Sequence, residues 1–226
     1  MKKITLVANT KKTSVRIAEV FGISPQISRL TKENEKDFFA KNYPLGEKMN
    51  ESTHVFSSTI FTNKNGQMRL FMAALPVDVC DEIARAGAEN HGSIHRIAAI
   101  DCVEHTLFRE YSEIFAPHER AFIFFPQDNG LRVLYIKENL PTGAVFISNH
   151  PDYRVAEFMR FYNALEESRE SNEREMGEQD TNESKTQETQ RAILLNFNEN
   201  FRWLQELLTA QNILHKEAQH TEQENK

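Results

Sequence analysis

Cysteine and long apolar runs are the first things this sequence lacks. Its 226 residues include only two cysteines, Cys80 and Cys102, each among apolar neighbours in a helical pattern. This excludes a disulfide framework and a zinc knuckle, so we expect reduced, buried thiols in a cytoplasmic protein. No window approaches the roughly 20 apolar residues of a transmembrane helix. The amino-terminal segment MKKITLVANT turns polar too soon for a signal peptide.

Basic residues are also in deficit. The chain has 27 Lys and Arg against 33 Asp and Glu, a net charge of −6. Proteins that bind nucleic acids need clustered Lys and Arg to neutralise phosphates, so we expect no nucleic-acid partner. Hydrophobic residues make up 39% of the chain, which is enough for a packed core in one large or two small domains.

Familiar catalytic motifs are absent. The sequence has no nucleophile elbow, no Walker loop and no His-Glu metal motif. Its densest group of reactive side chains is Asp101-Cys102-Val103-Glu104-His105. Because Asp101 and His105 lie one helical turn apart, a metal site or a Cys-His site can be imagined. We favour a helix cap, a buried thiol and a surface histidine, and therefore predict no catalytic residue, no metal and no enzyme.

The clearest structural pattern lies between residues 121 and 165. Residues 122–125 are apolar throughout, which is typical of a strand buried on both faces. Two more strand patterns follow at 131–137 and 144–147, and the second is entered through a turn predicted at 138–143. The pattern predicts three short strands joined by tight turns.

A helix is predicted after these strands, because four apolar residues recur at helical spacing on one face. They are Val155, Phe158, Met159 and Tyr162. A helix of this kind is expected to lie over the three-stranded sheet.

Residues 1–120 alternate between strand and helix patterns. Strands are predicted at residues 3–8, 14–21, 53–61, 67–74 and 93–100. Helices are predicted at residues 31–42, from Pro76 onward, and at 102–115 with Asp101 as its cap. The Asn-Lys-Asn-Gly sequence at 63–66 is a strong hairpin signal between two of these strands.

The order of these elements supports a resemblance that covers residues 43–165. Its segments are Tyr43-Pro44-Leu45, the strand at 55–61, Phe71 to Pro76, the helix beginning Val77-Asp78-Val79, and Ile100-Asp101 with the helix after it. In this order they resemble the PilM-like proteins, the actin-like assembly proteins of type IV pili, which are related to the cytoplasmic domain of the type II secretion platform protein. The resemblance implies an α/β fold with a partial actin-like (RNase H-like) sheet and flanking helices.

The family's nucleotide site uses an Asp-x-Gly phosphate loop at the start of each half of the fold. The first loop would fall on residues 8–12, where neither the Asp nor the Gly is present. In the second, Asp128 and Gly130 have the family spacing, and they are the candidate cofactor-binding residues, although a plain hairpin turn explains them as well. We therefore predict no cofactor.

The segment 166–190 contains almost no apolar residue. Nine acidic residues less three basic ones give it a charge of −6, equal to that of the whole chain. Such a composition cannot bury enough surface to offset its ordering entropy, so a disordered acidic linker is predicted.

A second amphipathic helix is predicted at residues 192–214, within a carboxy-terminal segment 191–226 whose end is polar. It would either dock on its own domain or bind in a groove of a partner protein. Six residues are the candidates for partner binding: Leu194, Phe197, Phe201, Trp203, Leu204 and Leu208.

These observations predict a truncated actin-like domain over 1–165, the linker 166–190, and the helical tail 191–226. The expected function is that of a non-catalytic cytoplasmic scaffold in assembly of a type IV pilus or a related secretion platform. The resemblance implies self-association, a partner with a short cytoplasmic tail in the inner membrane, and a location at the inner face of that membrane through partners only. The alternatives are a nucleotide-binding actin-like ATPase of the same machinery and an unrelated α+β binding module.

Overall fold

The chain folds into two compact units, which are described separately here. The first consists mainly of residues 1–114 and the second mainly of residues 115–138 and 145–220. The computed structural model describes residues 2–8, 12–20, 52–91, 95–116, 119–127, 129–175 and 189–219. The predicted helix at 31–42 lies outside these ranges.

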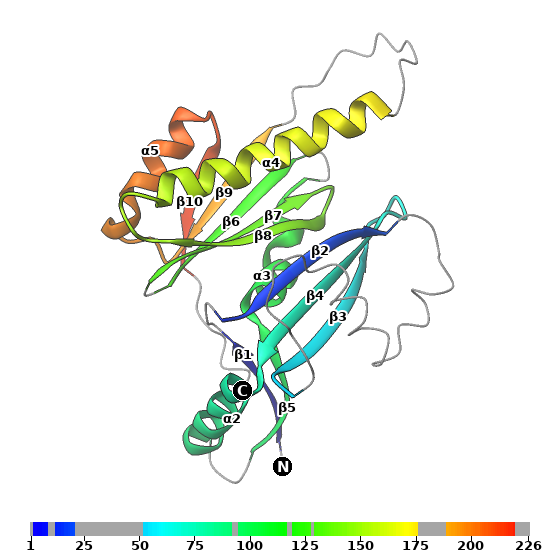
Figure 1. The fold of residues 1–226 in the computed structure, drawn as a ribbon, viewed down its shortest axis with the longest axis vertical. Helices are drawn as coiled ribbons and strands as arrows, with labels where there is room; N and C mark the ends of the chain where they lie inside the picture. Colours follow the sequence, from blue (N-terminus) through cyan, green and yellow to red (C-terminus); the bar gives the residue numbers. More distant parts are fainter. Residues whose placement is uncertain are drawn as a thin grey trace. The chain divides into compact units, whose positions relative to one another are not determined.

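The first unit contains two sheets (Figure 1). Strand β1 (Lys2–Ala8) pairs in parallel with β5 (His95–Cys102). The other sheet is antiparallel, in the order β2 (Ser14–Val20), β4 (Met68–Pro76), β3 (His54–Thr62). All five strands were predicted from the sequence, and their presence is confirmed.

The hairpin between β3 and β4 forms where its sequence indicates. The side chain of Asn63 accepts hydrogen bonds from the backbone N–H groups of Asn65 and Gln67, both at 3.0 Å. Gly66 has a φ of 79°, a conformation that glycine adopts without steric cost. This local chemistry sets the register of β3 on β4.

Two helices complete the first unit. Helix α2 (Val77–His91) packs on β1 and β5, and a small core forms from Ala8, Leu75 and Val79. Helix α3 (Val103–Tyr111) follows β5 directly. The prediction that Asp101 caps α3 is wrong, because Cys102 is the N-cap residue and no side chain caps the helix. Asp101 instead accepts a hydrogen bond from the N–H of Cys102 through Oδ1, at 2.9 Å.

The second unit contains one five-stranded sheet, in the order β10-β9-β6-β7-β8. The first three strands along the chain are β6 (Arg120–Gln127), β7 (Gly130–Lys137) and β8 (Leu140–Ser148). They match the three predicted strands. The turn between β7 and β8 is shorter than predicted, because the positive φ values of Glu138 and Asn139 complete it and residues 140–143 already belong to β8.

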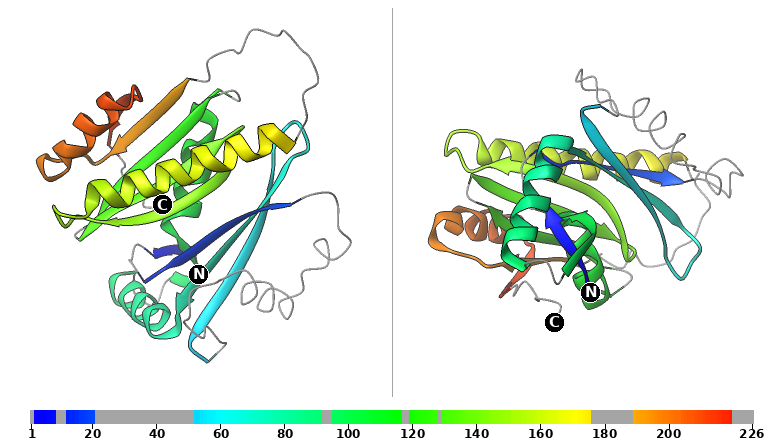
Figure 2. Two further views of the ribbon diagram at one scale, coloured as in Figure 1. Left: turned by 45° about the horizontal axis from the view of Figure 1, so that its top comes forward. Right: turned by 90° about the horizontal axis from the view of Figure 1, so that it is seen from below.

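Strand β6 is central because both of its faces are buried. It pairs antiparallel with β7 and parallel with β9 (Gln190–Leu195). Phe122 and Phe124 belong to one buried cluster, together with Phe158 of helix α4 (Arg154–Glu175). Ile123 lies between the two phenylalanines, so its side chain points to the opposite face, and it is also fully buried. Figures 1 and 2 show α4 lying across one face of this sheet.

The prediction of one amphipathic helix at 192–214 is wrong. These residues form strand β9, a short 3-10 turn, helix α5 (Arg202–Ala210) and strand β10 (Leu214–Ala218). Strand β9 inserts beside β6, and β10 extends the sheet in parallel beyond β9. The tail is therefore an integral part of the second unit.

Three asparagines mark the ends of these short elements. Asn196 ends β9 with a φ of 48°, and the side chain of Asn198 accepts a hydrogen bond from the N–H of Asn200 at 3.0 Å. Asn212 ends α5 with a φ of 57°, while the N–H of Ile213 reaches back to the carbonyl of Leu208 at 2.9 Å. This is a Schellman arrangement, in which a left-handed residue stops the helix.

The predicted boundary at residue 165 is also wrong, because α4 continues to Glu175. Residues 176–188 of the predicted linker lie outside the described ranges. Near the point where the chain returns, one ion pair connects it to the residue before β6, and another connects β6 to α4. The carboxylate of Glu119, 6% exposed, pairs with Arg191 at 2.7 Å, and the guanidinium of Arg120, 3% exposed, pairs with Glu166 at 2.6 Å.

Replacing Leu204 with alanine tests the position of α5. Leu204 is fully buried in the cluster around Phe122 and Phe158, so we expect Leu204→Ala to lower the free energy of unfolding of the second unit by about 2–5 kcal/mol. Chemical denaturation measures this loss. The control is Glu206→Ala on the exposed face of the same helix, which should change stability by less than about 0.5 kcal/mol. Equal stability of the two variants would show that the helix is not docked.

Candidate functional site

The six residues predicted to bind a partner lie in the second unit, and the structure uses them inside it. Leu194, Phe201, Leu204 and Leu208 are buried, with at most 3% of their surface exposed. Phe197 and Trp203 are partly buried and pack against the same cluster. The segment therefore docks on its own unit, which was one of the two alternatives, although it does so as a strand and a short helix. Sequence periodicity alone could not reveal this, because a strand and a helix in succession mimic one longer helix.

Of the two candidate cofactor residues, only Gly130 lies within the described ranges. Gly130 opens β7 and pairs with Gln127 at the end of β6, which agrees with a plain hairpin, whereas Asp128 lies outside the described residues. A β-carbon at Gly130 would lie 2.3 Å from the carbonyl oxygen of Ile147 and 2.5 Å from the ring of Phe146. Close packing against β8 is thus a sufficient reason for glycine at this position.

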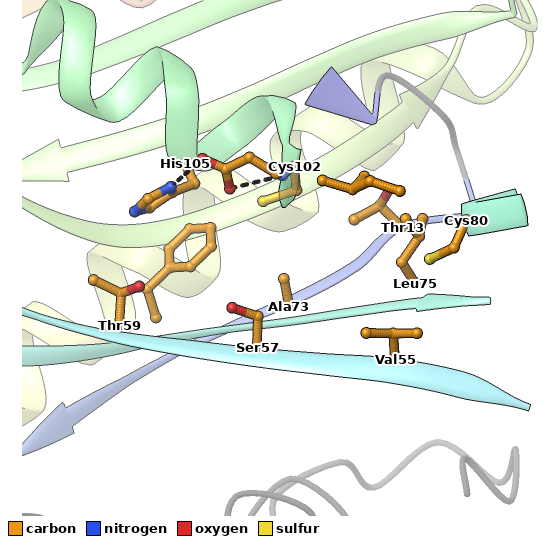
Figure 3. Close-up of a pocket in the computed structure, with 12 residues that line it drawn as sticks. Thr13, Val55, Ser57, Thr59, Ala73, Leu75, Cys80, Cys102 and His105 are labelled. Carbon is orange, nitrogen blue, oxygen red and sulfur yellow. Dashed lines mark hydrogen bonds and ion pairs between the residues drawn. The ribbon is translucent and has the colours of Figure 1, made fainter. Parts of the chain in front are cut away.

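A cavity of about 270 Å³ lies within the first unit (Figure 3). Its floor is one face of the hairpin formed by β3 and β4. There the register places Val55 opposite Leu75, Ser57 opposite Ala73, and Thr59 opposite Phe71. Because side chains alternate along a strand, these residues of β3 all face the cavity.

The remaining walls of the cavity come from other elements of the same unit. Cys80 of α2, Ile100 at the end of β5, and His105 of α3 line it, together with Thr13 just before β2. Figure 3 places Thr13 beside Leu75 and Cys80 at one end, and His105 at the other. The lining is mostly apolar, with a few polar groups held on rigid strands and helices, which is the usual composition of a binding pocket.

Asp101 and His105 interact directly at this cavity. Asp101 Oδ2 and His105 Nδ1 are 2.6 Å apart, and both residues line the cavity. The imidazole packs against Phe61 and Phe71, with ring centroids 5.4 Å and 5.6 Å away. Only 15% of the His105 side chain is exposed, so the interpretation of a surface histidine is wrong.

The two thiols of the cavity are free, and Cys102 is buried as predicted. Burial, reinforced by the carboxylates of Asp81 and Asp78, raises the pKa of the Cys80 thiol above its usual value. Cys80 is thus mostly protonated at neutral pH and a poor nucleophile. Among the described residues, no three His, Cys, Asp or Glu side chains gather so that they could hold a metal ion. The arrangement can bind a ligand that combines an apolar part with a group that forms hydrogen bonds.

Comparisons with known proteins give structural likeness only. A search with protein-family models finds no match, and a search of curated protein sequences finds none either. A solved structure of a Bacteroides thetaiotaomicron protein with an actin-like ATPase fold and unknown function aligns over 95% of this chain and 67% of its own, with a TM-score of 0.51 and 8% identity. The PilM-PilN type IV pilus biogenesis complex aligns over 99% of this chain and 74% of its own, with a TM-score of 0.55 and 13% identity.

These findings define the class of protein. The chain has an actin-like α/β fold, as the order of its predicted elements indicates. At 8% and 13% identity, the two structures are similar to this chain in fold, and that likeness alone does not extend to what they bind. No helix in the described ranges has the length and the apolar character needed to cross a membrane.

Replacing Gly130 with alanine tests whether packing explains this glycine. The added methyl group would meet a backbone oxygen of β8 and the ring of Phe146, over which the Arg132 guanidinium lies at 5.4 Å. We expect Gly130→Ala to destabilise the protein by about 1–3 kcal/mol through overpacking, measured by chemical denaturation. Asn129→Ala, at the exposed turn position beside it, is the control and should have little effect. A stable Gly130→Ala variant would contradict the packing explanation.

Proposed function

We propose that this protein is a non-catalytic, cytoplasmic scaffold in assembly of a type IV pilus or a related secretion platform, and that it acts by binding other proteins. The fold likeness to the PilM-PilN complex, which extends over 99% of this chain, supports the machinery named here. The resemblance in the order of the sequence elements points to the same machinery. Self-association of the chain stays a prediction.

The observation that carries the proposal is the cavity of the first unit. Three residues of β3, Val55, Ser57 and Thr59, face it, and β3 is an edge strand of its sheet among the described residues. Edge strands have backbone groups without a neighbouring strand, and extended peptides commonly bind along them. Val55 leaves 50% of its surface exposed at this position. A short extended segment with apolar side chains therefore suits both the edge and the cavity.

The segment would belong to a membrane partner. The resemblance implies the short cytoplasmic tail of an inner-membrane pilus or secretion protein, and such tails lack a fold of their own. A tail of this kind orders on binding, so its affinity is modest for the surface that it buries. Membrane association of the scaffold would then arise only through the partner.

One observation favours a second candidate, a nucleotide-binding ATPase of the same machinery. The similar Bacteroides protein is described as having an actin-like ATPase fold. In this chain Asp128 would be the acidic residue of the phosphate loop, whereas the first loop position, residues 8–12, has neither the Asp nor the Gly.

Filling the cavity tests the scaffold proposal. Ser57 faces the cavity from an exposed position on β3, so we expect Ser57→Tyr to fold normally and to block binding. The probes are synthetic peptides of the cytoplasmic tails of inner-membrane pilus and secretion proteins from the same genome, titrated by fluorescence anisotropy. At least one should bind the native chain, and Ser57→Tyr should weaken it by more than tenfold. Thr62→Tyr, also exposed on β3 but on its opposite face, is the matched control and should bind normally.

A nucleotide titration separates the two candidates. We expect calorimetry with magnesium-ATP to detect no saturable binding to the native chain, because the first phosphate-binding loop lacks its Asp and Gly. Asp128→Ala is the paired variant. Tight magnesium-ATP binding that disappears in Asp128→Ala would overturn the scaffold proposal and favour the ATPase.

A further inference from the structure

The hydrogen bond that Asp101 accepts from His105 fixes which nitrogen of the imidazole carries the proton. A carboxylate can only accept a hydrogen bond, so the proton of a neutral imidazole must lie on Nδ1, which faces Asp101 Oδ2 at 2.6 Å. The other ring nitrogen, Nε2, is then an acceptor with a free lone pair. Asp101 is itself held in place by the N–H of Cys102, at 2.9 Å. The tautomer of the ring is therefore set by two successive hydrogen bonds.

The acceptor Nε2 has no hydrogen-bond partner within the part of the chain that the structure describes. Aromatic rings lie beside the imidazole instead: Phe61 and Phe71 are within 5.6 Å of it, centroid to centroid. Only 15% of the His105 side chain is exposed, so water has limited access to the ring. A ligand that donates a hydrogen bond to Nε2 would give this acceptor a partner.

A second polar group at the opposite end of the cavity is also without a partner. Thr13 is only 6% exposed, and its hydroxyl oxygen makes no hydrogen bond within the described ranges. Between Thr13 and His105 lie the apolar side chains of Leu75 and Ala73, and Phe71 also lines the cavity. The cavity thus presents apolar side chains from β4 along its length, the hydroxyls of Ser57 and Thr59 from β3 beside them, and a polar group without a partner at each end. This suits one extended segment better than a compact polar metabolite.

We propose that His105 selects the bound segment by accepting a hydrogen bond from one of its N–H or O–H groups, with Asp101 as the positioning residue that keeps Nε2 an acceptor. This inference rests on the proposed function, because the ligand is the segment that occupies the cavity. It adds a requirement that an apolar cavity alone does not impose: the segment must place a donor at the His105 end.

The role of Asp101 is tested by the tautomer of His105. Nitrogen NMR of the full chain with ¹⁵N-labelled histidine, in mildly alkaline buffer, should show the proton on Nδ1 of His105 in the native protein. In Asp101→Asn the amide can donate to Nδ1, so the proton should move to Nε2. A role for Asp101 in helix structure alone would leave the tautomer unchanged, and that result would overturn the positioning role.

The role of His105 is tested with peptides selected for binding. Heptapeptides are selected from a phage-displayed library on the immobilised native chain. Each binder that Ser57→Tyr rejects is resynthesised with every backbone N–H methylated in turn and every side-chain donor removed in turn. We expect one such change to weaken binding to the native chain by about tenfold. The same change should not affect peptide binding to the His105→Phe variant, which keeps the aromatic packing.

His54→Phe, on the opposite face of β3, is the matched control and should respond like the native chain. The possible failures are distinct. If no selected peptide is rejected by Ser57→Tyr, the cavity is not the docking site, and the proposed function fails with it. If cavity-binding peptides are found but the loss of each donor weakens binding to the native chain and to His105→Phe equally, the proposed function survives and the inference about His105 is overturned.

Discussion

The pairing of β6 with β7 on one side and β9 on the other is the constraint on which the second unit depends. Phe122 and Phe124 point to one face of the sheet, and Ile123 points to the other, and all three are buried. A strand with apolar side chains on both faces is stable only if both of its edges are paired and both faces are covered. Helix α4 covers one face, and the return of the chain through β9 pairs the second edge.

Local sequence patterns were sufficient to predict the strands of the first unit and β6, β7 and β8. In these segments apolar spacing and turn residues agree, and the Asn63 turn is an example in which the side chain itself closes the hairpin. The pattern failed between residues 190 and 218, because Leu194, Phe201 and Leu204 fit a helical period although a strand and a helix supply them. Asn196, whose backbone is left-handed, was the residue that could have marked the end of the strand. It marks a strand end only because β9 pairs with distant strands, and no local sequence window contains that pairing.

In the sequence, the only sign of the candidate site was the spacing between Asp101 and His105. Asp101 and His105 are four residues apart, and that spacing brings them together at the start of a helix. The burial of His105 depends on Phe61 and Phe71 from the distant hairpin, so a surface histidine was the natural interpretation of the sequence alone. The cavity itself gathers residues from 13 to 105 across five elements and the loop before β2, and a single sequence does not report such contacts.

The position of β9 has a consequence for the folding of the protein during its synthesis on the ribosome. Gln190, which pairs with Arg120, is synthesised about seventy residues later, so the middle of the sheet must wait for its neighbour. At typical rates of translation this delay lasts several seconds, during which the edge of β6 has no partner. An unpaired apolar strand can join another chain, so we expect the nascent protein to need protection by chaperones until β9 emerges.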